Sequence, residues 1–142
     1  MSWELKAGAA GEHLVCADLF IRGFTATRTG IPGPWDIIAE VDRHLVKIQV
    51  KTTLAARPFP QERQRHVIGY TWQIRHGKGA GRKYADGLVD IFALVALDVR
   101  RIAYVISAER LQTFQIASPG FSKSPTAKTF DQYSWEITSA KL

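Results

Sequence analysis

Two alternating strands joined by a tight turn constrain this chain more than any other part of its sequence. Residues 35–41 and 44–53 alternate apolar and polar side chains, and Asp42-Arg43 lies between them as a two-residue turn. One face of this hairpin is apolar, and it is formed by Trp35, Ile37, Ala39, Val41, Val46, Ile48 and Val50. A slip of one residue would turn that face toward water, so the pattern specifies the register strongly.

The polar face of the same hairpin brings an acid, an amide and a lysine together. In this register Asp36 lies opposite Gln49 and diagonal to Lys51. The side-chain oxygens of Asp36 and Gln49, with the main-chain carbonyl of Val50, suit Mg²⁺, which keeps several waters and tolerates few protein ligands. The Lys51 ammonium can stabilise negative charge on a phosphate. Each residue alone is more often ordinary strand surface, and only the grouping favours a site.

The first helix contributes a further acid. Residues 3–22 are expected to form a helix that stops at Gly23. Glu12 lies in the middle of an apolar stripe formed by Leu5, Gly8, Val15, Cys16 and Leu19. A carboxylate on that side faces the sheet and needs a partner, because a lone buried charge is costly. The alternative is a rotated helix with Glu12 in solvent, since a second apolar side is formed by Ala10, Leu14, Ala17 and Ile21.

The remaining patterns predict an α/β fold in a single domain over residues 1–142. Strands are expected at 24–28, 66–74, 90–97 and 102–106, and the apolar run 90–97 is typical of a buried central strand. Ser107 is expected to cap a helix over 108–115, with loops at 54–65 and 117–129 and a last ordered element around Tyr133 and Trp135. One helix, six strands and a second helix together predict a mixed sheet flanked by helices.

The charge of the chain favours a polyanionic partner. The sequence has 19 Lys and Arg against 13 Asp and Glu, a net charge of +6 and a pI near 9.7. The basic residues expected to contact nucleic acid are Arg57, Arg63, Arg65, Arg75, Lys78, Arg82 and Lys83. The alternative is that these clusters are solvated surface loops.

Several classes of protein are disfavoured by what the sequence lacks. No apolar run approaches the roughly 18 to 20 residues of a membrane span, and the N-terminus has no signal-peptide pattern. The single cysteine, Cys16, excludes an internal disulfide framework and a cysteine-rich zinc site. The basic glycine-rich loop at 77–82 lacks the spacing of a nucleotide-binding loop. We therefore expect a cytoplasmic protein without a membrane partner.

Three short segments together resemble a known family. Gly11-Glu12 in the first helix, Trp35-Asp36 entering the hairpin, and Gln49-Val50-Lys51 followed by Thr52 resemble the PD-(D/E)XK nuclease superfamily, in the form where glutamine replaces the acid before the lysine. The most similar subgroup is the small endonucleases associated with group I introns, and archaeal Holliday-junction resolvases are more distant. The resemblance covers about residues 5–115. The chain departs from the pattern at Trp35, which separates the proline from the aspartate, and at the uncharged Gln49.

The resemblance implies a restriction-endonuclease-like fold and a magnesium-dependent DNA endonuclease in which Mn²⁺ can substitute. By that resemblance Asp36 and Gln49 are metal-site residues, Lys51 is the catalytic lysine and Glu12 is the acid carried by the helix. With the Val50 carbonyl from the hairpin, the expected metal site is Glu12, Asp36, Gln49 and Val50, and the expected catalytic residues are Glu12, Asp36, Gln49 and Lys51. Because cutting two strands requires two active sites or a repositioned one, a homodimer or homotetramer is expected. Three alternatives stay open. One is a structure-selective, junction-resolvase-like nuclease, and another is a catalytically silent DNA-binding domain, which the missing charge at Gln49 allows. The third is a structural or interaction domain whose basic surface meets an acidic protein partner.

Overall fold

The computed structural model describes residues 2–59, 67–74, 88–107, 112–118, 120 and 127–142. Its elements, in chain order, are α1 (Trp3–Ile21), β1 (Thr25–Arg28), β2 (Ile37–Val41), β3 (His44–Thr53), β4 (Arg57–Pro58), β5 (Ile68–Gln73), β6 (Ile91–Ala96), β7 (Arg101–Ile106), β8 (Thr113–Ala117), the 3-10 helix η3 (Asp131–Tyr133) and α2 (Trp135–Ser139). None of the helices in these ranges is long and apolar enough to cross a membrane.

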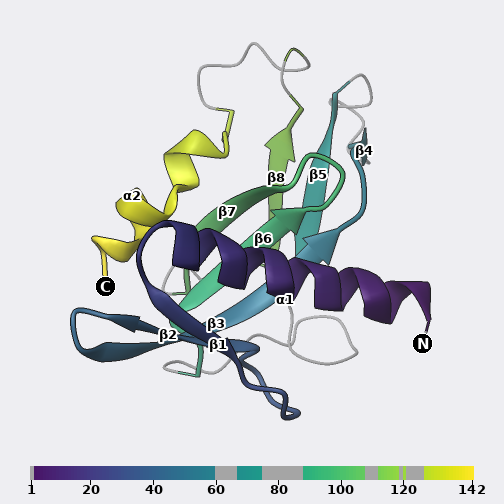
Figure 1. Cartoon of the computed structure of the whole chain (residues 1–142). Coiled ribbons are helices and arrows are strands. Elements are labelled where there is room, and N and C mark those ends of the chain that lie inside the picture. Colours follow the sequence, from purple (N-terminus) through teal and green to yellow (C-terminus); the bar gives the residue numbers. More distant parts are fainter. Residues whose placement is uncertain (1, 60–66, 75–87, 108–111, 119, 121–126) are drawn as a thin grey trace.

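The strands form a central sheet and a smaller second sheet. The central sheet has the order β1-β2-β3-β6-β7, and the second has the order β4-β5-β8. Only the β3–β6 pair of the central sheet is parallel, so this sheet is mixed. Helix α1 runs across one face of the central sheet, and the small sheet lies beyond the other face (Figure 1). The predicted mixed sheet flanked by helices is therefore present, with a second sheet that the sequence analysis did not expect.

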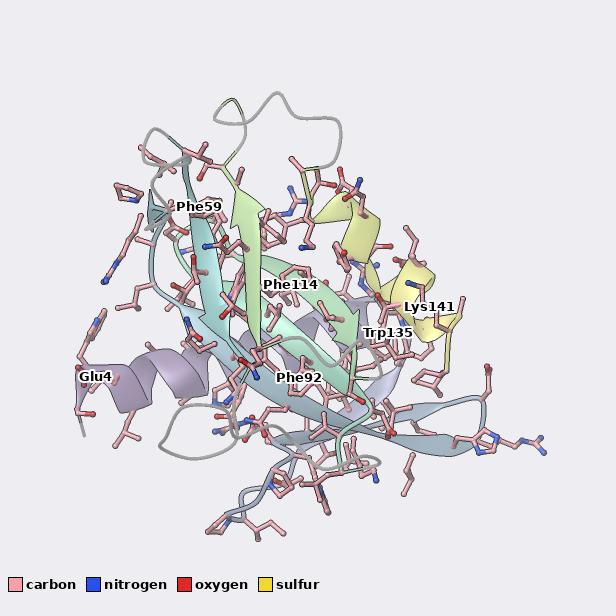
Figure 2. All side chains as sticks on the ribbon, turned by 180° about the vertical axis from the view of Figure 1, so that it is seen from behind. Glu4, Phe59, Phe92, Phe114, Trp135 and Lys141 are labelled. Carbon is pink, nitrogen blue, oxygen red and sulfur yellow. The ribbon has the colours of Figure 1, made fainter. Side chains whose placement is uncertain are left out.

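Two apolar clusters lie on the two faces of the central sheet. On the helical face, Trp135 of α2 packs edge-on against Phe24 and Tyr104, with ring centroids 5.4 and 5.1 Å apart. On the other face, Phe92 of β6 packs with Phe114 and other aromatic residues of the small sheet. Figure 2, seen from behind, places Phe114 on the small sheet and Trp135 on α2. All six residues of β6 are buried, because the strand has a core on both sides.

The β2–β3 hairpin has the predicted register. Val41 pairs with His44 and Ile37 with Ile48. The turn residues Asp42 and Arg43 have φ values of 50° and 67°, as a two-residue type I′ turn requires. Most of the predicted apolar face is inside: Ile37, Ala39 and Ile48 have no exposed surface, and Val46 and Val50 are also buried. Its two end residues, Trp35 and Val41, are only half-buried.

The helix expected over 108–115 is wrong where the structure describes it. Residues from Thr113 to Ala117 form β8, which pairs antiparallel with β5. Residues 108–111 lie outside the described part. The reason is an alternation of period two: Phe114 and Ile116 are buried and their neighbours are not. The expected loop at 54–65 likewise contains β4, whose Arg57 pairs with Gly69 of β5.

The buried side of α1 also differs from the predicted stripe. The buried residues are Ala7, Gly11, Val15 and Leu19, four apart, whereas Leu5 is 65% exposed. Glu12 therefore lies beside the buried stripe instead of in its middle, and it is partly exposed. A helix with so many alanines and small residues shows little contrast between its sides, so its rotation is set by packing against the sheet.

Gly11 is where α1 approaches β3 most closely. A Cβ atom at this position would lie 2.0 Å from Oγ1 and 3.2 Å from Cβ of Thr52, far inside normal contact. At Gly8, one turn earlier in the same helix, an added Cβ would meet nothing within 4 Å. Gly11 thus sets the distance between α1, which carries Glu12, and β3, which carries Lys51.

We predict that Gly11→Ala lowers the free energy of unfolding by about 1–3 kcal/mol, because the methyl group overpacks the helix–strand contact. Gly8→Ala is the matched control, and it should raise stability by about 0.5–1 kcal/mol through helix propensity alone. Adding Thr52→Ala to Gly11→Ala should restore part of the loss, since the clashing hydroxyl is removed. Chemical denaturation of the four proteins measures this, and equal stabilities for Gly11→Ala and Gly8→Ala would contradict the close contact.

Candidate active site

The candidate site begins where β2 stops pairing with β3. The last paired residues are Ile37 and Ile48, and the Asp36 amide then donates to the Ile48 carbonyl at 2.8 Å. Beyond that point β3 continues to Thr53, and the Asp36 side chain, in place of β2, forms hydrogen bonds with the edge of β3. Oδ2 of Asp36 accepts the Val50 amide at 2.9 Å and Nε2 of Gln49 at 2.9 Å. The structure thus brings Asp36 and Gln49 together, and neither bond uses Oδ1 of the carboxylate.

The orientation of the Gln49 amide follows from this contact. A carboxylate can only accept, so the amino group of Gln49 faces Asp36 and its oxygen points elsewhere. That oxygen, Oε1, is buried and has no hydrogen-bond partner among the described residues. A buried acceptor without a donor is costly, which marks Oε1 as an oxygen available to a cation.

The main chain of Val50 supplies a further oxygen on the same side. In a strand, the N–H and C=O of one residue point to the same neighbour. Because the Val50 amide points at Asp36, its carbonyl faces the same way, and Nε2 of Gln49 lies 3.5 Å from it.

Glu12 and Lys51 meet these groups across one cavity of about 700 Å³. Burial raises the pKa of Glu12, and the negative charge of Asp36 raises it further, while Arg28 acts in the opposite direction. Burial also raises the pKa of Asp36, opposed by the Val50 amide, Lys51 and Arg28. The two carboxylates are thus close enough to repel each other, and each is balanced by cations.

Arg28 belongs to this site and was missed by the sequence analysis. Its guanidinium forms an ion pair with Glu12, with Nη2 and Oε2 3.6 Å apart, and Nη1 lies 3.1 Å from Nε2 of His13. The available signal was strand alternation: Ala26 is buried under α1, and Arg28, two residues later, points to the same face. The sequence of this short strand gave no reason to expect an ion pair with Glu12 instead of a fully solvated arginine.

The oxygens present fit a hard cation that keeps part of its water shell. They come from Glu12, Asp36, the Gln49 amide and the Val50 carbonyl. Within the described ranges no three His, Cys, Asp or Glu residues gather in a way that could hold a metal. These donors are all oxygens, which is the ligand type that magnesium and manganese prefer, whereas structural zinc sites use cysteine sulfur and histidine nitrogen.

Arg57 is the described member of the basic residues expected to contact DNA. It lies on β4, is exposed, and lines the same cavity as Lys51 and Asp36. The other six predicted contacts, Arg63, Arg65, Arg75, Lys78, Arg82 and Lys83, lie outside the described residues.

Comparison with known proteins supports the fold. No protein-family model and no curated protein sequence matches the chain. A solved structure, "The structure of a bacterial homing endonuclease: I-Ssp6803I", is similar with a TM-score of 0.69 and 13% identity, over 99% of this chain and 93% of that one. The predicted restriction-endonuclease-like α/β arrangement is confirmed at the level of a nuclease-like fold. The chain therefore shares, over almost its whole length, the fold of a bacterial homing endonuclease.

Proposed function

We propose that this protein is a metal-dependent DNA endonuclease that hydrolyses phosphodiester bonds. The observation that carries the proposal is the buried Oε1 of Gln49, which has no hydrogen-bond partner among the described residues. Asp36 holds this amide in place beside Glu12 and Lys51. The likeness to a homing endonuclease supports DNA as the substrate and the homing type as the biological setting. The basic pI agrees with a polyanionic partner. We place this activity in the cytoplasm as part of the proposal.

Each side chain has a distinct task in this reaction. Glu12, Asp36, Gln49 and the Val50 carbonyl would hold Mg²⁺, with Mn²⁺ as a substitute, and the ion would stabilise negative charge on the phosphate. Asp36 also fixes the orientation of the Gln49 amide. Lys51 offsets charge that develops on the phosphate during attack by water. Glu12 supplies the negative charge that glutamine at position 49 does not.

Cutting both strands of a duplex requires two such sites or one site that is repositioned. We therefore propose that the protein acts as a homodimer or homotetramer on DNA. A junction-resolvase-like nuclease would use the same residues on branched DNA. Incubation with linear, supercoiled and four-way-junction DNA, with and without magnesium, separates the two by the products.

A catalytically silent DNA-binding domain is the second candidate, and one observation favours it. Among the proposed metal ligands only Glu12 and Asp36 carry a carboxylate, and Gln49, which completes the set, is neutral. Binding of DNA without cleavage of any of the three substrates at any magnesium concentration would support the silent domain over the endonuclease.

We predict that Asp36→Asn and Lys51→Met reduce the cleavage rate by on the order of 100-fold or more while DNA binding is retained. Lys47→Met is the matched control for Lys51, because it removes a lysine from the same face of β3 outside the cavity. Single-turnover cleavage and a gel-shift titration measure both properties. Near-normal cutting by Lys51→Met would falsify its catalytic role.

The Gln49 variants test the metal site separately. Gln49→Glu adds a charged ligand of nearly the same size, so cleavage should continue at a lower magnesium concentration. Gln49→Leu removes the oxygen and should raise the magnesium requirement or stop cleavage. Cleavage is measured against magnesium concentration for both variants. A wild-type curve for Gln49→Leu would mean that Gln49 is ordinary strand surface, and cutting by Gln49→Glu alone would identify a silenced nuclease.

We predict that Arg57→Ala weakens binding to DNA of every sequence and reduces the slope of log affinity against log salt by about 0.9, as expected for loss of one phosphate contact. Arg43→Ala, at the hairpin turn, removes the same charge away from the cavity and should leave the slope unchanged. Fluorescence anisotropy at several salt concentrations measures it. Equal slopes for the two variants would move the DNA contact away from β4.

A further inference from the structure

Arg28 is held between the first helix and the residue that begins the hairpin. It is the last residue of β1 and pairs with Ile37 of β2, next to Asp36. The chain just after it is tied to the same place: the Thr29 amide donates to the Asp36 carbonyl at 2.9 Å, and the Thr29 hydroxyl donates to the Trp35 carbonyl at 3.2 Å. The base of the Arg28 side chain is thus fixed relative to Asp36.

Its guanidinium reaches across to α1. The ion pair with Glu12 has Nη2 and Oε2 3.6 Å apart, and the side chains of Arg28 and Glu12 are 37% and 23% exposed. Glu12 is half-buried and Arg28 is partly exposed, so water screens this pair less than a fully exposed one but does screen it. Burial raises the pKa of both Glu12 and Asp36, and Arg28 opposes that rise at each, so its charge acts on the two carboxylates together.

The positive charge of Arg28 opposes the binding of a cation by these carboxylates. The guanidinium and a divalent ion repel each other, and both are attracted to Glu12. Separating Arg28 from Glu12 is then part of the free energy of cation binding. Once separated, the guanidinium has five N–H donors and a geometry that matches a phosphate.

We propose that Arg28 is the internal counter-ion of Glu12 and Asp36, that it competes with the divalent cation in the DNA-free protein, and that a DNA phosphate takes it over when the cation binds. The inference rests on the proposed metal-dependent nuclease function. It makes cation and DNA binding cooperative, because each relieves the interaction that opposes the other. The affinity of the site for the divalent cation is therefore low until DNA is present.

The first experiment measures Mn²⁺ affinity without DNA by isothermal titration calorimetry. Arg28→Met removes the charge but keeps the length of the side chain, and it should bind Mn²⁺ about 5-fold tighter or more, the lower end of typical coupling between sites. Arg28→Lys keeps the charge and should stay close to wild type. Arg43→Met is the control for net charge and should not change the affinity. Equal or weaker Mn²⁺ binding by Arg28→Met overturns the proposal.

The second experiment measures the coupling with DNA. Mn²⁺ affinity is determined with and without saturating linear duplex DNA, for Lys51→Met and for Lys51→Met/Arg28→Met, so that the proposed cleavage does not consume the substrate. DNA should enhance Mn²⁺ affinity more in the protein with Arg28, by the same factor that Arg28→Met gains without DNA. If DNA enhances Mn²⁺ affinity equally in both proteins, the proposed transfer of Arg28 from Glu12 to a DNA phosphate is overturned.

The outcome also separates this inference from the proposed function. If wild type cleaves DNA with metal and Arg28→Met binds Mn²⁺ no more tightly, the counter-ion role fails and the endonuclease stands. If no variant binds Mn²⁺ and wild type never cleaves, the proposed function fails and this inference falls with it. Thermal unfolding of each variant confirms that the fold is intact before the affinities are compared.

Discussion

The pairing of β2 with β3 is the constraint on which the rest of the structure depends. It buries Ile37, Ala39 and Ile48 against α1, and in the same register β2 begins one residue after Asp36. Because the pairing of β2 with β3 does not extend past Ile37 and Ile48, the Val50 amide has no partner on β2, and the Asp36 carboxylate accepts its hydrogen bond. The core and the candidate site therefore share one register, and no change of pairing can alter one without the other.

The first helix adds the remaining acid through a contact between small groups. Gly11 lets α1 lie against Thr52, and the next residue, Glu12, then reaches the cavity beside Asp36. Arg28 comes from the other side of this contact and balances both carboxylates. The site takes its side chains from α1, the end of β1, the residue before β2 and the edge of β3, so its geometry depends on how these segments pack together.

The parts that the sequence predicts well are those set by local pattern. The limits of α1, the turn at Asp42-Arg43 and the grouping of Asp36 with Gln49 follow from alternation and turn chemistry within a short segment. The strand β8 was mistaken for a helix because its five residues form a strand through pairing with β5, about forty residues earlier in the chain. The rotation of α1 and the place of Arg28 depend on packing between segments, which no local pattern contains.

The parallel pairing of β3 with β6 has a consequence for how this protein is made. Glu12, Asp36, Gln49 and Lys51 all belong to the first half of the chain, yet the second edge of β3 is covered only by Ile91–Ala96. Pairing between segments so distant is slow to form, because a long loop must close first. During synthesis the hairpin can therefore assemble early while β3 keeps an open apolar edge, the kind of edge that invites aggregation. Yield of the folded protein should therefore be limited by how soon β6 docks.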